Sequence, residues 1–117
     1  SKEFIDSVDY IKKNHESTVQ AGTNTTIGAI AMNAKLTKAE AKKIASLVQN
    51  ALARTIFPVH TMFDGDTIFV LGTGTKKYAV AYLGTLAQEV MEKAIIKAVK
   101  AAEPIDHMES YSSLQTK

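Results

Sequence analysis

A threonine at the start of an uncharged, β-branched run is the first residue in this sequence that could do chemistry. Thr25 follows the polar stretch 14–24 and begins the run TTIGAIAM at 25–32. A threonine hydroxyl is a weak nucleophile until a base removes its proton. The α-amine of an N-terminal threonine, with an ordinary pKa of about 8, can act as that base. Two threonines at a strand start are also common because of β-propensity alone, and that structural interpretation stays open here.

Self-cleavage before Thr25 would create the required amine. The Thr25 hydroxyl would attack the carbonyl of Asn24, and the acyl group would move from nitrogen to oxygen. Water would then hydrolyse the ester and free Thr25. Such a site needs an exposed loop directly before a rigid strand, and the polar stretch followed by the apolar run fits that requirement.

Two carboxylates in the stretch FDGDT at 63–67 form the second candidate site. Asp64 and Asp66 are two residues apart, so their side chains can lie on the same side of an extended chain. Such a pair can share a proton, or it can orient a hydroxyl or an ammonium group. The structural alternative is a hairpin turn, because Asp-Gly is a strong turn signal and Asp66 would then cap it. A calcium loop is disfavoured because the spaced ligands of an EF-hand are missing.

The remaining polar motifs indicate neither a metal nor a cofactor. His15, His60 and His107 lie in three separate segments without the spacing of metal ligands. His60 is close in sequence to the Asp pair, and we expect a structural or supporting role for it. The stretch GTGT at 72–75 is too short to bind phosphate, and there is no P-loop. The chain has no cysteine, which excludes disulfides and thiolate metal sites.

Composition limits the classes of function. A length of 117 residues fits one small domain or a piece of a larger one, and the net charge of +2 does not favour nucleic acid or a membrane. The basic residues between Lys35 and Arg54 have no interleaved aromatics and fit a solvated helix face. No apolar run reaches the ~18 residues of a membrane span, and charges interrupt any signal peptide. We therefore predict a cytoplasmic protein, and the initial Ser1 suggests processing or a start inside a longer gene product.

Hydrophobic spacing predicts the elements that must position these residues. We expect an amphipathic helix at 3–13, a polar loop at 14–24 and a buried strand at 25–32. A helix should follow from a Thr37–Glu40 capping box to about Thr55. After it we expect a turn at 63–65, a strand at 67–72, a helix at about 80–103 and a polar tail at 105–117. Gly28 should allow close backbone approach. The last helix should present one apolar face, formed by Leu83, Leu86, Ala87, Val90, Met91, Ala94, Ile95 and Ala98. Because two strands are marginal alone, we expect a partner segment to complete the sheet.

Three stretches together resemble one known family. They are GTNTTIG at 22–28, NAKLTKAEA at 33–41, and LAR at 52–54 followed by PVHTMFDGDTIF at 58–69. Their order and spacing resemble the DmpA-like aminopeptidase/D-esterase family, which includes β-peptidyl aminopeptidases and nylon-oligomer hydrolases. The resemblance covers about residues 2–102.

The resemblance implies an α/β fold that is part of a four-layer αββα sandwich, like ornithine acetyltransferase, completed by an N-terminal α part. By position, Thr25 matches the nucleophile that begins the β part, and Asn24 precedes the autocleavage point. Asp64 and Asp66 match the acidic pair of the threonine-type members, which would orient the Thr25 amine and hydroxyl. Residues 1–24 would then be the end of the α part and the processing linker, and residues 25–117 the β part.

The implied function is that of a self-processing N-terminal-nucleophile aminopeptidase or amidase. It would hydrolyse N-terminal amino acids or small amides through a Thr25 acyl-enzyme. The implied partners are the α part of the same precursor, a peptide or amide substrate, and further αβ units in a homo-oligomer. Because the α part would supply the substrate pocket, a non-catalytic fragment or assembly module remains an alternative. An acyltransferase on the same fold is a third.

Overall fold

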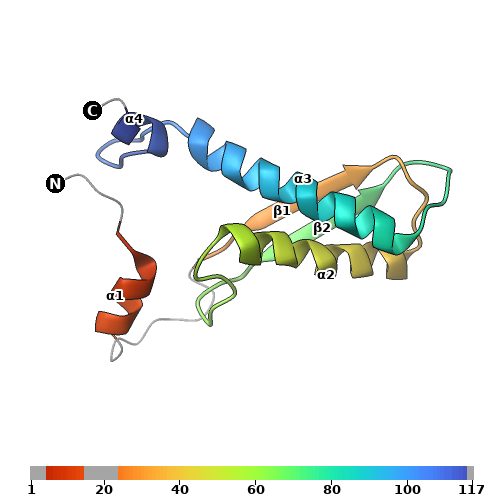
Figure 1. Cartoon of the computed structure of the whole chain (residues 1–117), viewed down its shortest axis with the longest axis horizontal. Helices are drawn as coiled ribbons and strands as arrows, with labels where there is room; N and C mark the ends of the chain where they lie inside the picture. The colour runs from red at the N-terminus through yellow and green to blue at the C-terminus, as the bar shows by residue number, and fades with distance from the viewer. Residues whose placement is uncertain (1–4, 15–23, 116–117) are drawn as a thin grey trace.

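The computed structural model of the chain describes residues 5–14 and 24–115. The elements are α1 (Ser7–Lys13), β1 (Ile27–Met32), α2 (Lys38–Thr55), β2 (Thr67–Gly72), α3 (Val80–Ala101) and α4 (Tyr111–Gln115), as Figure 1 shows. They form a mixed α/β unit around a two-stranded parallel sheet. Most of the expected loop at 14–24, including His15, lies outside the described residues.

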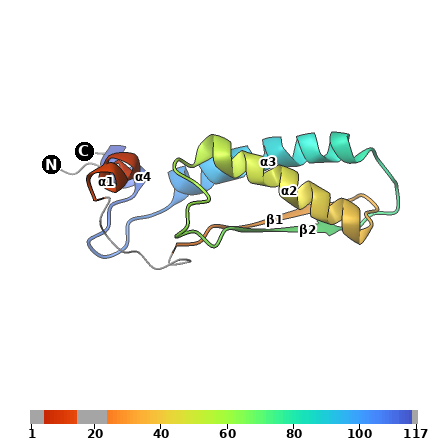
Figure 2. The same cartoon turned by 90° about the horizontal axis from the view of Figure 1, so that it is seen from below.

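The two strands run in the same direction because α2 carries the chain back between them. Ile27 pairs with Thr67, and the register continues to Met32 opposite Gly72. A parallel pair needs a long crossover, which α2 and its flanking loops supply. Both α2 and α3 lie on one face of the sheet (Figure 2). The opposite face is therefore left to solvent or to another segment.

The core lies between the two long helices and the sheet. α2 and α3 pack on each other, and the buried side chains are Ile44, Val48, Ala51 and Leu52 from α2, Leu83, Ala87 and Met91 from α3, and Ala34 from the loop before α2. Gly28 allows the close approach expected of it. A Cβ at Gly28 would stand only 2.7 Å from Cδ1 of Ile68 and 3.0 Å from Cε of Met91.

The expected apolar face of the last helix is only partly correct. Leu83, Ala87 and Met91 recur every four residues and form the line that packs against the core. Leu86 and Val90 lie beside that line but are 41% and 60% exposed. The apolar arc of α3 is therefore wider than the surface that residues 5–14 and 24–115 cover.

The expectation that residues 25–32 form a fully buried strand is wrong for this chain. β1 begins at Ile27 and alternates between exposed and half-buried side chains. Ile27, Phe69 and Leu71 lie on the uncovered face and are 70%, 60% and 60% exposed. The physical reason is that both helices cover the same side, so no described element covers the second apolar face of the sheet.

Both ends of the described chain differ from expectation. Asp6 caps α1, so this helix begins at Ser7 rather than at residue 3, and it buries none of its residues. α3 ends at Ala101, two residues before the expected end. The expectation of a polar tail is wrong for 111–115, because α4 forms there and contacts α3. Ser110 and Ser113 hold the start of α4: each hydroxyl accepts a hydrogen bond from the other residue's N–H.

The capping box at the start of α2 is confirmed. The Glu40 N–H donates to Oγ1 of Thr37 at 3.1 Å, and the Thr37 N–H donates to Oε1 of Glu40 at 3.0 Å. The backbone and hydroxyl of Thr37, with a smaller contribution from Lys77, hold the pKa of Glu40 below its ordinary value. A carboxylate with a lowered folded-state pKa stabilises the fold above its unfolded pKa. That contribution is lost as the pH falls through the folded-state value.

Thr37→Ala should lower the free energy of unfolding by about 1 kcal/mol at neutral pH, because an N-terminal N–H of α2 loses its acceptor. Thr85→Ala is the matched control. The Thr85 hydroxyl bonds to the carbonyl of Ala81 within α3, and its removal should change stability by less than ~0.5 kcal/mol. Urea unfolding measures both, and equal losses would contradict the role of the cap. In acid, the difference in free energy of unfolding between wild type and Glu40→Gln should become smaller as Glu40 is protonated.

Candidate active site

The candidate site lies where the chain before β1 runs beside the chain before β2. Asn24 and Asp64 form a parallel bridge three residues before the first strand pair, Ile27 and Thr67. The Asn24 N–H donates to the carbonyl of Phe63 at 2.9 Å, and the Gly65 N–H donates to the carbonyl of Asn24 at 2.7 Å. The parallel pairing thus extends outward past the strand ends. It brings together two stretches that are forty residues apart in the sequence.

Thr25 lies directly against Gly65. A Cβ built on Gly65 would stand 3.2 Å from Oγ1 of Thr25 and 3.9 Å from the carbonyl oxygen of Asn24. A side chain at position 65 would therefore crowd the hydroxyl. The Thr25 side chain is exposed. The Thr25 hydroxyl and the Asn24 carbonyl thus both lie next to Gly65, which has no side chain.

Asp66 is half-buried as a residue, and its nearly buried side chain has two partners. Its Oδ1 accepts a hydrogen bond from the Thr26 N–H at 3.0 Å, and its Oδ2 is 2.7 Å from Nδ1 of His60. The Asp66 side chain is only 5% exposed, whereas that of His60 is 38% exposed. His60 has a φ of 55°, a conformation that non-glycine residues rarely adopt. This contact with Asp66 agrees with the structural or supporting role expected for His60.

Asp64 closes a short turn of its own. Its Oδ2 accepts from the N–H of Thr61 at 2.7 Å and from the Thr61 hydroxyl at 2.8 Å. The hairpin alternative for this stretch is wrong, because β2 pairs with β1 in parallel rather than with an adjacent strand. Thr61 was not among the candidate residues of the site. Its position three residues before an aspartate is the signal that could have indicated it, since such pairs often close turns.

Asn24, Thr25, Asp64 and Asp66 therefore lie in one place. Within 24–115, no hydrogen bond joins the Thr25 hydroxyl to either carboxylate. The Asp64 carboxylate instead accepts from Thr61, and the Asp66 carboxylate accepts from the Thr26 N–H. Backbone pairing of Asn24 with Asp64 holds the chain just before Thr25, and the Asp66 bond holds it just after.

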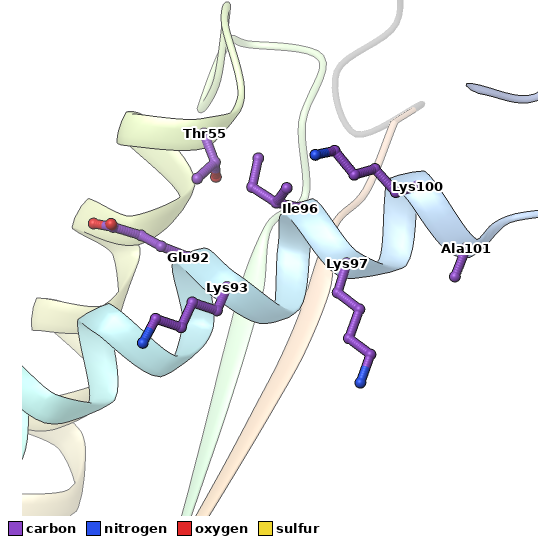
Figure 3. Close-up of a pocket in the computed structure, with 7 residues that line it drawn as sticks. All are labelled: Thr55, Glu92, Lys93, Ile96, Lys97, Lys100 and Ala101. Carbon is purple, nitrogen blue, oxygen red and sulfur yellow. The ribbon is translucent and has the colours of Figure 1, made fainter. Parts of the chain in front are cut away.

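Other polar features do not join this site. His107 is exposed in the 105–108 turn. An open groove of about 680 Å³ lies at the C-terminal ends of α2 and α3 and is lined by Thr55, Glu92, Lys93, Ile96, Lys97, Lys100 and Ala101 (Figure 3). Its acid, Glu92, is paired with Arg54 at 2.8 Å, and its lysines lie on the surface of α3. The groove contains no nucleophile beside a base.

The described part of the chain, residues 5–14 and 24–115, offers neither a metal-binding cluster nor a membrane-spanning helix. No group of three or more His, Asp or Glu side chains there could hold a metal ion. None of its helices combines the length and the apolarity needed to cross a membrane.

Comparison with known proteins gives consistent matches. The model of peptidase family S58 matches residues 4–112. The chain is 34% identical over 106 residues to an uncharacterized aminopeptidase of Mycobacterium leprae, covering 78% of this chain and 29% of the relative. It is 36% identical over 94 residues to a 6-aminohexanoate-oligomer endohydrolase of Kocuria sp., covering 69% and 26%. A 6-aminohexanoate-oligomer endohydrolase of Paenarthrobacter ureafaciens is 34% identical over 90 residues, covering 66% and 25%. The chain thus spans between a quarter and a third of the length of these relatives.

Proposed function

This chain belongs to peptidase family S58, the family of the DmpA-like aminopeptidases, and we propose that it carries the nucleophile of a self-processing amidohydrolase. Thr25 is that nucleophile, and the Asn24–Thr25 bond is the autocleavage point. The observation that carries the proposal is the parallel pairing that sets Asn24 beside Asp64 and leaves the Thr25 hydroxyl against Gly65. Residues 1–24 end the α part, and residues 25–117 belong to the β part.

In the processed enzyme, the freed α-amine of Thr25 is the general base. It takes the proton of the Thr25 hydroxyl, which attacks the substrate carbonyl and forms an acyl-enzyme. The amine leaving group departs, and water then releases the acid. Asp66 binds the backbone of the next residue, Thr26, and Asp64 lies opposite Asn24 in the backbone pairing. In this proposal the two acids orient the new ammonium or amine through hydrogen bonds once the chain is cut. No metal or cofactor takes part in this proposed reaction.

The substrate class follows from the names of the relatives. Those relatives are an aminopeptidase and two endohydrolases of 6-aminohexanoate oligomers, and both names describe cleavage of amide bonds. We therefore propose N-terminal amino acids and small amides as substrates. The side-chain pocket lies largely in the upstream α part.

An assay of the longer precursor tests this function. The precursor is incubated with amino-acid p-nitroanilides and with 6-aminohexanoate oligomers, and residues 1–117 alone serve as the control. Hydrolysis by the processed precursor, with none by the lone chain, supports the proposal. A processed precursor that hydrolyses neither class would favour the non-catalytic module. Transfer of the acyl group to an added amino acceptor in preference to water would favour the acyltransferase.

The uncovered side of the sheet supports completion by the α part. Ile27, Phe69 and Leu71 together form an apolar face that no described element covers. We propose that a second sheet from the α part packs there, which gives the four-layer αββα sandwich. Completed αβ units would then assemble into a homo-oligomer, for which the exposed Leu86 and Val90 of α3 offer a surface.

Phe69→Lys should separate the two parts of the precursor. A lysine at this position would place an unpaired charge between the two sheets, at a cost of about 3 kcal/mol or more. We expect the α and β parts to stop co-eluting in size-exclusion chromatography. Ile105→Lys is the matched control, because Ile105 is 70% exposed but lies in the 105–108 turn, away from the sheet. Co-elution that survives Phe69→Lys would contradict the four-layer arrangement.

A further inference from the structure

The hydrogen bond between Gly65 and Asn24 bears directly on the bond that is cut. The Gly65 N–H donates to the Asn24 carbonyl oxygen at 2.7 Å. In the proposed self-cleavage, this is the carbonyl that the Thr25 hydroxyl attacks. We propose that the Gly65 N–H is the oxyanion donor of the self-cleavage step, an inference that rests on the proposed function.

The chemistry of the step explains why a donor at this atom matters. When Oγ1 of Thr25 bonds to the carbonyl carbon of Asn24, the carbonyl π electrons move onto the oxygen. The resulting negative charge develops on the atom to which Gly65 already donates. Hydrogen bonds to charged acceptors are about twice as strong as neutral ones. A donor that is aligned beforehand requires no reorganisation as the charge appears.

The remaining electrons and protons balance without another reactant except water. The tetrahedral intermediate collapses as the bond from the Asn24 carbon to the Thr25 nitrogen breaks. The nitrogen takes up the proton that the hydroxyl has lost, and an ester remains. Water then adds to the ester carbon. Asn24 leaves as a carboxylic acid, and Oγ1 of Thr25 regains a proton.

The surrounding backbone fixes this donor. The Asn24 N–H is held by the carbonyl of Phe63 on one side, and the Thr67 N–H donates to the carbonyl of Thr26 at 3.0 Å on the other. The Gly65 N–H lies between these two bonds and cannot turn away without breaking the pairing. Position 65 thus has two functions. Its N–H holds the carbonyl, and its missing Cβ leaves room for the hydroxyl of Thr25.

A change confined to the backbone tests the role of the donor. Incorporation of glycolic acid at position 65 of the full precursor replaces the amide with an ester and removes only the N–H. The matched control is the α-hydroxy analogue of threonine at position 67, which removes the neighbouring bond to Thr26. Both variants lose one hydrogen bond of the same pairing, but only the first bond ends on the carbonyl that is cut.

We expect the ester at position 65 to slow cleavage at Asn24–Thr25 by about 100-fold or more, the usual effect of losing one oxyanion donor. The ester at position 67 should slow it by less than about 10-fold. Intact mass against time gives both rates, and melting curves in the Thr25→Ala background compare the folds. Equal slowing in the two variants, or unchanged cleavage with the ester at position 65, would overturn the inference. In either case, a wild type that still cuts leaves the proposed function intact.

A second measurement requires no ester. The Thr25→Ala precursor is labelled with ¹³C at the Asn24 carbonyl, and its infrared amide band is recorded. A band lowered in frequency from that of a carbonyl without a hydrogen bond is expected from the Gly65 N–H. A band at the position of the unbonded carbonyl would contradict the inference, even if the ester variant does not fold.

Discussion

Thr25→Ala is expected to leave the precursor uncut and unable to hydrolyse amides, with a loss of about 10⁴-fold or more in both rates. The substitution removes the oxygen that makes the first attack in both reactions. Thr25→Ser keeps a hydroxyl and should still be cut. The fold should persist in both variants, because the Thr25 side chain is exposed. Gel analysis and intact mass measure cleavage of both variants, and p-nitroanilide turnover measures hydrolysis.

Thr26→Ala is the matched control for this variant. Thr26 contacts the site through its backbone: its N–H donates to Asp66, and its carbonyl accepts from Thr67. Loss of its side chain should therefore leave cleavage intact. Cleavage at Asn24–Thr25 that continues in Thr25→Ala would contradict the role of this hydroxyl.

Asp66→Asn is expected to slow processing and turnover by about 10²-fold to 10⁴-fold, the range for loss of a positioned acid–base group. The amide has nearly the same shape. The amide oxygen of the asparagine can still accept a hydrogen bond from the Thr26 N–H. Its NH2 group can donate to Nδ1 of His60. The variant thus removes the negative charge while it keeps the contacts. Thermal melting and cleavage rates are measured on the same preparations.

Asp106→Asn serves as the control for Asp66→Asn. Asp106 is exposed in the 105–108 turn, far along the chain from both strands. Its substitution should leave cleavage unchanged. If Asp66→Asn processes at the wild-type rate, the buried carboxylate has only a structural role, and the acidic pair must be reassigned.

The elements that local signals specify were predictable from the sequence. α2 starts after the Thr37–Glu40 capping box and ends before Pro58, as expected. β2 has the bounds expected from its β-branched and aromatic run. These signals depend on residues within a few positions of each other, so hydrogen bonding and steric restriction act before any tertiary contact forms.

Features that depend on distant contacts were not predictable in the same way. Asp64-Gly65 has the composition of a hairpin turn, yet the strand that pairs with β2 lies forty residues earlier. Asp64 therefore pairs in parallel with Asn24, just before the paired strands β1 and β2. The partners of the two acids, Thr61 and His60, depend on how the 56–62 loop folds back, and no periodic pattern encodes that path.

The grouping of the site residues came from the resemblance rather than from their spacing. Taken separately, Thr25 was a strand residue and Asp64 a turn residue. The register of the sheet brings them together, because Ile27 opposite Thr67 sets the preceding residues side by side. A shift of the register by one residue would move the Asn24 carbonyl off the Gly65 N–H.

The most direct test of the account is the N-terminal sequence of the small fragment in the purified wild-type precursor. Processing as proposed yields a fragment that begins Thr-Thr-Ile-Gly-Ala, with Thr25 as its first residue and a free α-amine. A precursor that stays whole, or a fragment that begins at any other residue, would contradict the assignment of Thr25 as the nucleophile.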